Sequence, residues 1–409
     1  MSTATACRSC GAAGLAPVLD LGRTPLANRL LDAGQLAEPE PTYPLDLAFC
    51  PRCTLLQITE TVPPEALFRD YVYFSSFSDT MLRHSERIAE RLIAERKLGS
   101  ESLVVEAASN DGYLLQFFAR RGVPVLGIEP ARNIAAVARE KGIPTVDEFF
   151  GADLAAQLSD QGKQANIFLA NNVLAHVADL NGFVRGVQVL LAPDGRAAIE
   201  APYAKDMIDH VEFDTIYHEH LCYFTLTALD RLFRRHGLVI VDVERVPIHG
   251  GTLHVTAAHE GQAEPGKAVV DLLAEERAWG VDRPDFYLGF RRRVEQLKGD
   301  LLALLGRLKG QDQRIAAYGA SAKGSTLLNY FGIGRETLDF VADRSTYKQG
   351  RFTPGTHLPI VAPEHLLETQ PDYTLLLTWN FADEILEQQA EYRRRGGKFI
   401  VPIPEVRVV

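Results

Sequence analysis

The chain has 409 residues, of which 46% are hydrophobic and 23% are charged, and its net charge is −10. This composition is typical of a folded globular protein and excludes a disordered chain, a collagen-like repeat and a small disulfide scaffold. The negative charge argues against binding to nucleic acid or to an anionic membrane, because both need surplus Lys and Arg. No apolar run reaches the ~20 residues of a membrane span, and the first residues lack a signal-peptide pattern, so we expect a cytoplasmic enzyme.

Four of the five cysteines form two C-x-x-C pairs near the start of the chain, Cys7/Cys10 and Cys50/Cys53. Each pair can point two thiolates at one ion, and four thiolates complete the closed tetrahedral shell of a structural zinc site. Two disulfides are disfavoured in a reducing compartment, and neither pair opens a helix after a strand as a redox motif would. We therefore predict a zinc-binding module over residues 1–62.

A charged helical stretch is expected from Thr80 to about Arg96, after an aromatic segment at 68–78. Beyond it, short β-branched runs alternate with helical stretches, which predicts a parallel sheet with right-handed crossovers over residues 63–262. The expected strands are Leu103–Glu106, Val125–Ile128, Ile167–Ala170, Ala197–Glu200, Leu238–Val243 and Thr252–Thr256.

The turn after the first of these strands has the features of a cofactor site. It presents backbone N–H groups to a ligand, and Glu129 ends the next strand, where a carboxylate can accept hydrogen bonds from ribose hydroxyls. The dinucleotide fingerprint G-x-G-x-x-G is absent, and the acidic Glu106 on the first strand suits a cofactor that carries an amino group. The sequence therefore predicts S-adenosylmethionine and not a nicotinamide dinucleotide. The expected cofactor-binding residues are Glu106, Ala108, Asn110, Asp111, Gly112, Glu129, Pro130, Asn171 and Asn172.

A cluster of titratable residues follows at Tyr217-His-Glu-His220. Alkylation of a carbon beside a ketone needs a base for the α-proton and hydrogen-bond donors for the enolate oxygen, and this cluster offers both. His176 follows the third expected strand in the chain, at the sheet edge where α/β proteins bind ligands. A hydrogen-bonded corner without chemistry and a His-Glu-His metal site remain alternatives, although H-E-x-x-H spacing is absent.

The last hundred residues, 310–409, repeat the strand–helix alternation after a helical connector at 263–309. The expected strands are Ile315–Tyr318, Leu338–Val341, Tyr373–Leu377 and Lys398–Val401. Small residues in Gly319-Ala-Ser-Ala-Lys-Gly324 form a strand-to-helix turn whose N–H groups suit a diphosphate, although the spacing is not that of a Walker A loop. Solvated surface charge is the alternative for each basic residue. The candidates for substrate contact are Lys323, Lys348, Arg351 and Asn380.

The two cysteine pairs and five further motifs follow one another along the chain. The five further motifs are Glu106–Leu115, Gly127–Pro130, Asn171–Val177, Tyr217–Leu221 and Gly319–Gly324. In this order they resemble the sugar C-methyltransferases of deoxysugar biosynthesis, and the resemblance covers essentially the whole chain. It implies an α/β protein with a zinc-binding module, a Rossmann-like class I methyltransferase domain and a C-terminal Rossmann-like domain that binds a nucleotide sugar. The substrate would lie in the cleft between the last two.

The same resemblance implies a reaction and roles for residues. A monomeric enzyme would methylate C3 of a nucleotide-linked 4-keto-deoxyhexose, typically linked to thymidine diphosphate, with His220 as the general base. Tyr217 and Glu219 would orient the substrate or stabilise the enolate, and His176 would donate to the carbonyl oxygen. Tyr71, or Tyr73 in its place, would reach the site from a lid, although packing between domains is the other interpretation of that segment.

Two other functions remain open at this stage. An O- or N-methyltransferase acting on a sugar or another secondary metabolite would use a base against an O–H or N–H group. A protein with inactive enzyme domains, in which the zinc module serves interaction or regulation, is the alternative from another class.

Overall fold

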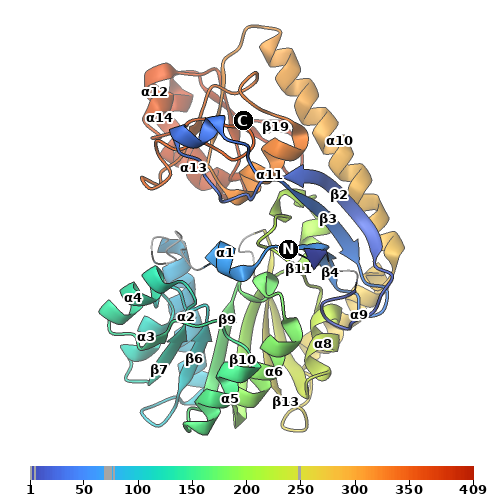
Figure 1. The fold of residues 1–409 in the computed structure, drawn as a ribbon, viewed down its shortest axis with the longest axis vertical. Helices are drawn as coiled ribbons and strands as arrows, with labels where there is room; N and C mark the ends of the chain where they lie inside the picture. Colours follow the sequence, from blue (N-terminus) through green and yellow to red (C-terminus); the bar gives the residue numbers. More distant parts are fainter. Residues whose placement is uncertain (1, 4–5, 69–75, 77–78, 247–249) are drawn as a thin grey trace.

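The structure is a computed structural model of the chain that describes residues 2–3, 6–68, 76, 79–246 and 250–409 (Figure 1). Two α/β sheets form the lower and upper parts of the molecule in this view, and an antiparallel sheet from the N-terminal region lies between them. The long helix α10 (Pro284–Lys309) runs along one side and leads into the upper part. None of the helices in the described part of the chain has the length and apolar character needed to cross a bilayer.

The N-terminal sheet has the strand order β11-β4-β3-β2 and is antiparallel throughout. Its strands are β2 (Ala16–Thr24), β3 (Tyr43–Phe49), β4 (Leu56–Ile58) and β11 (Cys222–Tyr223). A two-stranded pair of β1 (Ser2–Thr3) and β5 (Glu60–Thr61), the short helix η1 (Ala33–Ala37) and α1 (Pro64–Phe68) complete this region. Strand β11 comes from far along the chain, so this sheet contains a strand that follows the Tyr217–His220 motif directly.

The lower sheet has seven strands in the order β12-β13-β10-β9-β6-β7-β8, and β13 is antiparallel to both of its neighbours. The strands are β6 (Val104–Ala107), β7 (Val125–Ile128), β8 (Thr145–Val146), β9 (Ala165–Asn171), β10 (Leu191–Pro202), β12 (Leu238–Val246) and β13 (Thr252–His259). The remaining pairs are parallel, as the strand–helix alternation predicts.

Helices cover both faces of this sheet because its strands are apolar on both sides. Apolar residues of α2 (Asp79–Arg96) and α3 (Leu115–Ala119) pack with Val104, Ile167 and Ala198 of the sheet. The further helices are α4 (Arg132–Glu140), α5 (Ala152–Asp160), η3 (Leu174–His176), α6 (Leu180–Leu190), α7 (Ala204–Asp209), η4 (Phe213–Thr215) and α8 (Leu226–Arg234).

The upper sheet has the order β16-β15-β14-β17-β18-β19 and is parallel except for β19. Its strands are β14 (Ile315–Tyr318), β15 (Val341–Ala342), β16 (Ile360–Val361), β17 (Tyr373–Leu376), β18 (Lys398–Val401) and β19 (Arg407–Val408). Its helices are α11 (Ala322–Phe331), α12 (His365–Thr369), η5 (Trp379–Phe381), α13 (Ala382–Gln388) and α14 (Ala390–Arg394). The predicted fold class, a small cysteine module with two Rossmann-like α/β sheets, is confirmed.

The segment expected as a helical connector at 263–309 contains two helices. These are α9 (Lys267–Trp279) and α10, and Gly280 ends α9 with a positive φ of 81°. Pro284 then stands at the first turn of α10, where its missing N–H costs no helix hydrogen bond.

Candidate active site

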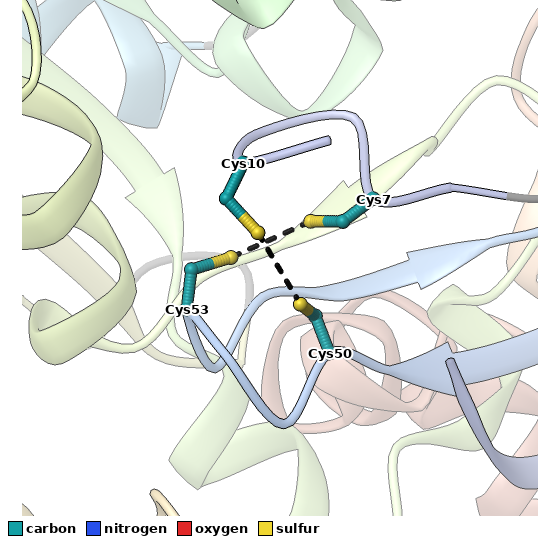
Figure 2. A group of neighbouring side chains, drawn as sticks. All are labelled: Cys7, Cys10, Cys50 and Cys53. Carbon is teal, nitrogen blue, oxygen red and sulfur yellow. Dashed lines mark hydrogen bonds between the residues drawn. The ribbon is translucent and has the colours of Figure 1, made fainter. Parts of the chain in front are cut away.

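The four paired cysteines converge, as Figure 2 shows; Cys7 and Cys10 come from the segment between β1 and β2, and Cys50 and Cys53 from the turn between β3 and β4. The Sγ atoms of Cys7 and Cys53 are 3.4 Å apart, those of Cys10 and Cys50 are 3.6 Å apart, and all four lie within 4.8 Å of one another. Four sulfurs at ~2.3 Å from one tetrahedral ion would be separated by about 3.8 Å, so the donor set and its spacing fit Zn²⁺. No disulfide joins any of the four in the structure.

The turn after β6 has the backbone of a close-approach ligand site. Ala108, Asn110 and Gly112 all adopt positive φ, at 52°, 49° and 78°. A Cβ on Gly112 would lie 2.8 Å from Cγ1 of Ile143, so only glycine fits there. Glu106 at this edge is fully buried, and neither of its carboxylate oxygens has a hydrogen-bond partner among the described residues.

Glu129 follows β7 and ties two backbone segments together. Its Oε2 accepts from the Asn110 N–H at 2.9 Å and its Oε1 from the Ala131 N–H at 2.8 Å. Burial raises the pKa of Glu129 to about 7, against the lowering effect of these two N–H groups. Pro130 follows it directly and is half-buried.

Asp111 has a different environment from the other predicted cofactor residues. Its Oδ2 accepts from Nζ of Lys141 at 2.7 Å and also from the Ser76 hydroxyl. These contacts hold Ser76 beside the turn. Tyr71 and Tyr73, which the sequence places in the same segment, lie outside the described residues.

The end of β9 completes this edge of the sheet. Asn171 ends the strand, and Asn172 adopts a positive φ of 55° while its N–H donates to the Glu200 carbonyl at 2.9 Å. The side-chain oxygens of both asparagines are buried and have no hydrogen-bond partner in the described part of the chain. Buried acceptors at the ends of β6 and β9 fit a ligand with ammonium and hydroxyl groups, as S-adenosylmethionine has.

Residues 217–220 form a turn and not an extended segment. This turn brings Tyr217 and His220 together beside His176. His220 Nδ1 donates to the Thr215 carbonyl at 2.9 Å, so its Nε2 is left as the acceptor for the Tyr217 hydroxyl at 2.8 Å. The rings of Tyr217 and His220 are 4.1 Å apart, and the His176 ring lies 4.8 Å from that of His220. The geometry thus gives His220 the lone pair that a general base needs.

His176 is linked to the same turn through the backbone. Its Nδ1 donates to the Glu219 carbonyl at 2.7 Å. Burial lowers the pKa of His176 to about 4, although the backbone carbonyls of Glu219 and Asn172 oppose this shift. The imidazole is therefore neutral at pH 7.

Glu219 is held by a residue that sequence reasoning missed. Asn28 Nδ2 donates to Oε1 of Glu219 at 2.8 Å and to Oε2 at 3.0 Å. Burial raises the pKa of Glu219 to about 7, and the Asn28 amide opposes this shift. His218, which lies between Tyr217 and Glu219 in the sequence, has a different partner. Its Nε2 donates to the Pro44 carbonyl at 3.0 Å.

The four residues predicted to contact the substrate all follow strands of the upper sheet: Lys323 follows β14, Lys348 and Arg351 follow β15, and Asn380 follows β17. Nζ of Lys348 donates to the Ala320 carbonyl at 2.8 Å, and Nζ of Lys323 lies 4.9 Å from the Trp379 ring centre. The Arg351 guanidinium lies over the Tyr347 ring, and Asn380 is half-buried in η5.

Comparisons with known proteins identify the family. Family models match a zinc binding domain at residues 7–68, a methyltransferase domain at 81–243 and a C-methyltransferase C-terminal domain at 247–404. The chain is 37% identical over 404 residues to the C-methyltransferase NovU of Streptomyces niveus, and the match covers 98% of this chain and 96% of NovU. The chain belongs to the C-methyltransferase family. With a methyltransferase domain matched at residues 81–243, this makes it an S-adenosylmethionine-dependent methyltransferase of that family.

Other similarities are partial. The ubiquinone biosynthesis O-methyltransferase of Methylobacterium nodulans is 29% identical over 141 residues, which are 33% of this chain and 54% of that protein. The solved magnesium protoporphyrin IX methyltransferase of Synechocystis with bound SAH is 14% identical, covering 44% of this chain and 83% of its own, with a TM-score of 0.36. A score this low supports no conclusion about the site.

Proposed function

We propose that this C-methyltransferase methylates C3 of a 4-keto-deoxyhexose linked to a nucleotide, thymidine diphosphate in the first instance, in the biosynthesis of branched deoxysugars. The observation that supports this most is the hydrogen bond from Nδ1 of His220 to the Thr215 carbonyl at 2.9 Å, which makes Nε2 the acceptor nitrogen of the neutral ring. Such a group suits the removal of a C–H proton beside a ketone. NovU, which is a C-methyltransferase by name, agrees with attack by carbon.

In the proposed reaction, Nε2 of His220 takes the C3 proton and the 4-keto oxygen receives the negative charge. Because Nε2 has a single lone pair, the Tyr217 hydroxyl that donates to it in the structure must turn away for Nε2 to take the C3 proton. It is then released to donate to the enolate oxygen. S-adenosylmethionine supplies an electrophilic methyl group on a positively charged sulfur.

The other residues of the site position these groups. Neutral His176 uses its Nδ1 proton in the hydrogen bond to the Glu219 carbonyl. We therefore assign His176 the role of orienting the His220 ring. Tyr217 is the residue that we expect to donate to the keto oxygen. We propose that Glu219 accepts a hydrogen bond from a sugar hydroxyl, because Asn28 holds its carboxylate at the site.

We place the diphosphate at the carboxyl edge of the upper sheet, beside the turn that starts α11. Gly319 has a φ of 93° there, and the Ser321 hydroxyl caps α11 by accepting from the Gly324 N–H at 3.0 Å. Arg351 suits contact with phosphate because its nearest acidic partner, Asp32, is 3.9 Å away and largely exposed. Asn380 is proposed to hydrogen-bond the base or the sugar.

The test is proton exchange and product analysis. The enzyme is incubated in D₂O with a thymidine-diphosphate 4-keto-2,6-dideoxyhexose and S-adenosylhomocysteine, and then with S-adenosylmethionine. Deuterium at C3 in the first reaction and a quaternary C3 methyl group in the second, read by mass and NMR, are the expected results. A methyl group on oxygen or nitrogen would contradict the enolate mechanism and favour the alternative methyltransferase. Binding of the cofactor without any reaction would contradict the substrate class.

A further inference from the structure

The loop that holds His220 is built between the two large sheets. The Thr215 carbonyl, which takes the Nδ1 proton of His220, belongs to the short helix η4. The Tyr223 hydroxyl also reaches this carbonyl, at 3.4 Å. Any movement of η4 would therefore change both the orientation of the His220 ring and the nitrogen that carries its proton.

Three residues of the C-terminal region hold this loop from the other side. Nε1 of Trp379 donates to Oδ2 of Asp214 at 2.7 Å, and both side chains are buried. The Phe331 ring stacks on Phe213, with centroids 4.9 Å apart and an angle of 21° between the planes. The Thr326 hydroxyl of α11 lies 3.3 Å from the Ile216 carbonyl. Residues Phe213 to Ile216 thus depend on the C-terminal domain for their position.

The positive charge of Lys323 also supports the contact between Trp379 and Asp214. Asp214 is fully buried, and burial raises the pKa of its carboxyl group, which the nearby Lys323 ammonium and the Trp379 N–H oppose. Nζ of Lys323 is itself buried, lies over the Trp379 ring and has no hydrogen-bond partner among the described residues. Lys323 therefore serves as a counter-charge to Asp214, and it also opposes the burial that raises the pKa of the neighbouring Glu212 to about 8.

We propose that Trp379 and Asp214 are positioning residues through which the C-terminal domain fixes the orientation and the protonated nitrogen of His220. The catalytic part of this proposal rests on the proposed role of His220 as the base. The C-terminal domain then does more than contact substrate. His220 has the ring orientation and the protonated Nδ1 that a base needs only when this domain packs on η4. This packing also gives Lys323 a role inside the protein in place of the predicted contact with a diphosphate.

The experiment compares two tryptophan variants, since the chain has 2 Trp residues. Trp379→Phe keeps an aromatic ring and removes only the N–H donor. Trp279→Phe is the matched control, because the described contact of its ring is with Nζ of Lys205 at 4.2 Å, outside the catalytic turn. The tautomer and pKa of His220 are read in both variants from ¹⁵N-histidine NMR spectra of the whole protein, with His220→Asn used for assignment.

Loss of the Thr215 carbonyl removes a partner of the protonated ring, so we expect the His220 pKa to fall in Trp379→Phe and its Nδ1 tautomer to become mixed. Among the described residues, the rings of Tyr217, His176 and Tyr223 face the His220 ring, and all three are unchanged in both variants. We expect kcat to fall by roughly 10- to 100-fold, with the affinity for S-adenosylmethionine unchanged. Trp279→Phe should change neither the NMR signals nor kcat.

A second variant separates positioning from general damage to the fold. Asp214→Ala should give the same NMR change as Trp379→Phe, and the double variant should be no worse than either single one, because both break one link. An unchanged His220 tautomer and pKa in Trp379→Phe would overturn the proposal. If the NMR signals shift while turnover does not, the positioning link stands and His220 is not the base, which contradicts the proposed function alone.

Discussion

At the scale of single residues, the site is defined by which nitrogen of His220 carries the proton. An amide in place of the ring can still donate to the Thr215 carbonyl but cannot accept a proton from carbon. We therefore expect His220→Asn to bind S-adenosylmethionine normally and to lose about 10²- to 10⁴-fold in kcat. Turnover and calorimetric cofactor binding measure the two effects. Undiminished turnover would refute the assignment of His220 as the base.

Glu219 makes a prediction about stability and pH. Because burial raises its pKa from 4.5 to about 7, the folded protein holds this proton more tightly than the unfolded chain. Stability from the protonated group is present below pH 4.5 and is lost as the pH rises through 7, by about 3 kcal/mol in total. Glu219→Gln should therefore be more stable than the wild type at pH 8 and about equally stable at pH 4.5.

Denaturant unfolding at both pH values measures this difference. Glu101→Gln, at an exposed position, is the control and should have the same stability as the wild type at both pH values. Equal stability of Glu219→Gln and the wild type at pH 8 would contradict the burial of a charged carboxylate at this position.

At the scale of elements, the turn between β6 and α3 can be tested with a matched pair of glycines. Gly112 and Gly122 have similar φ values, 78° and 75°, but a Cβ on Gly122 would meet nothing within 4 Å. Gly122→Ala should therefore cost only the ~1 kcal/mol of left-handed backbone. Gly112→Ala should cost ~1–3 kcal/mol more through the contact with Ile143, and should weaken cofactor binding.

Unfolding curves and calorimetric titration with S-adenosylhomocysteine give the two readings for this pair. Equal losses of stability in both variants would show that packing against Ile143 does not constrain the turn.

The elements that the sequence predicted well are those with a strong local signal. Apolar runs located β6, β7, β9 and β14 to within a few residues, because buried parallel strands are apolar on both faces. The strand expected at Leu338–Val341 is shorter in the structure and begins three residues further along the chain, as β15 (Val341–Ala342). The long strands β2 and β3 were not predicted, since β2 alternates irregularly between buried and exposed residues across two register shifts.

At the scale of the whole molecule, local sequence signals fail because the decisive contacts join distant residues. The cysteine pairs and the Tyr217–His220 motif could be found because their members lie a few residues apart. Asn28 meets Glu219 across 191 positions, and Trp379 meets Asp214 across 165. No spacing rule connects such pairs, and only the docking of three regions brings them together.

Strand β11 joins the N-terminal cysteine module to the turn that carries His220. It pairs with β4 through Cys222 and Gln57, and the Ile58 N–H donates to the carbonyl of Leu221, the residue after His220. Cys50 and Cys53 fix the turn that starts β4, so an ion bound there would hold the strand against which the catalytic turn is built.

Removal of the metal should therefore abolish turnover before it abolishes cofactor binding. We expect one zinc per chain in the wild type by elemental analysis, and its loss in Cys53→Ser, together with a lower melting temperature. Turnover should fall by at least ~10²-fold because Glu219 and His220 lose the support of Asn28 and β4, while S-adenosylmethionine still binds the lower sheet. Cys222→Ser, a buried cysteine outside the cluster, is the control and should keep its zinc. Full turnover by folded, zinc-free Cys53→Ser would mean that the catalytic turn does not need the module.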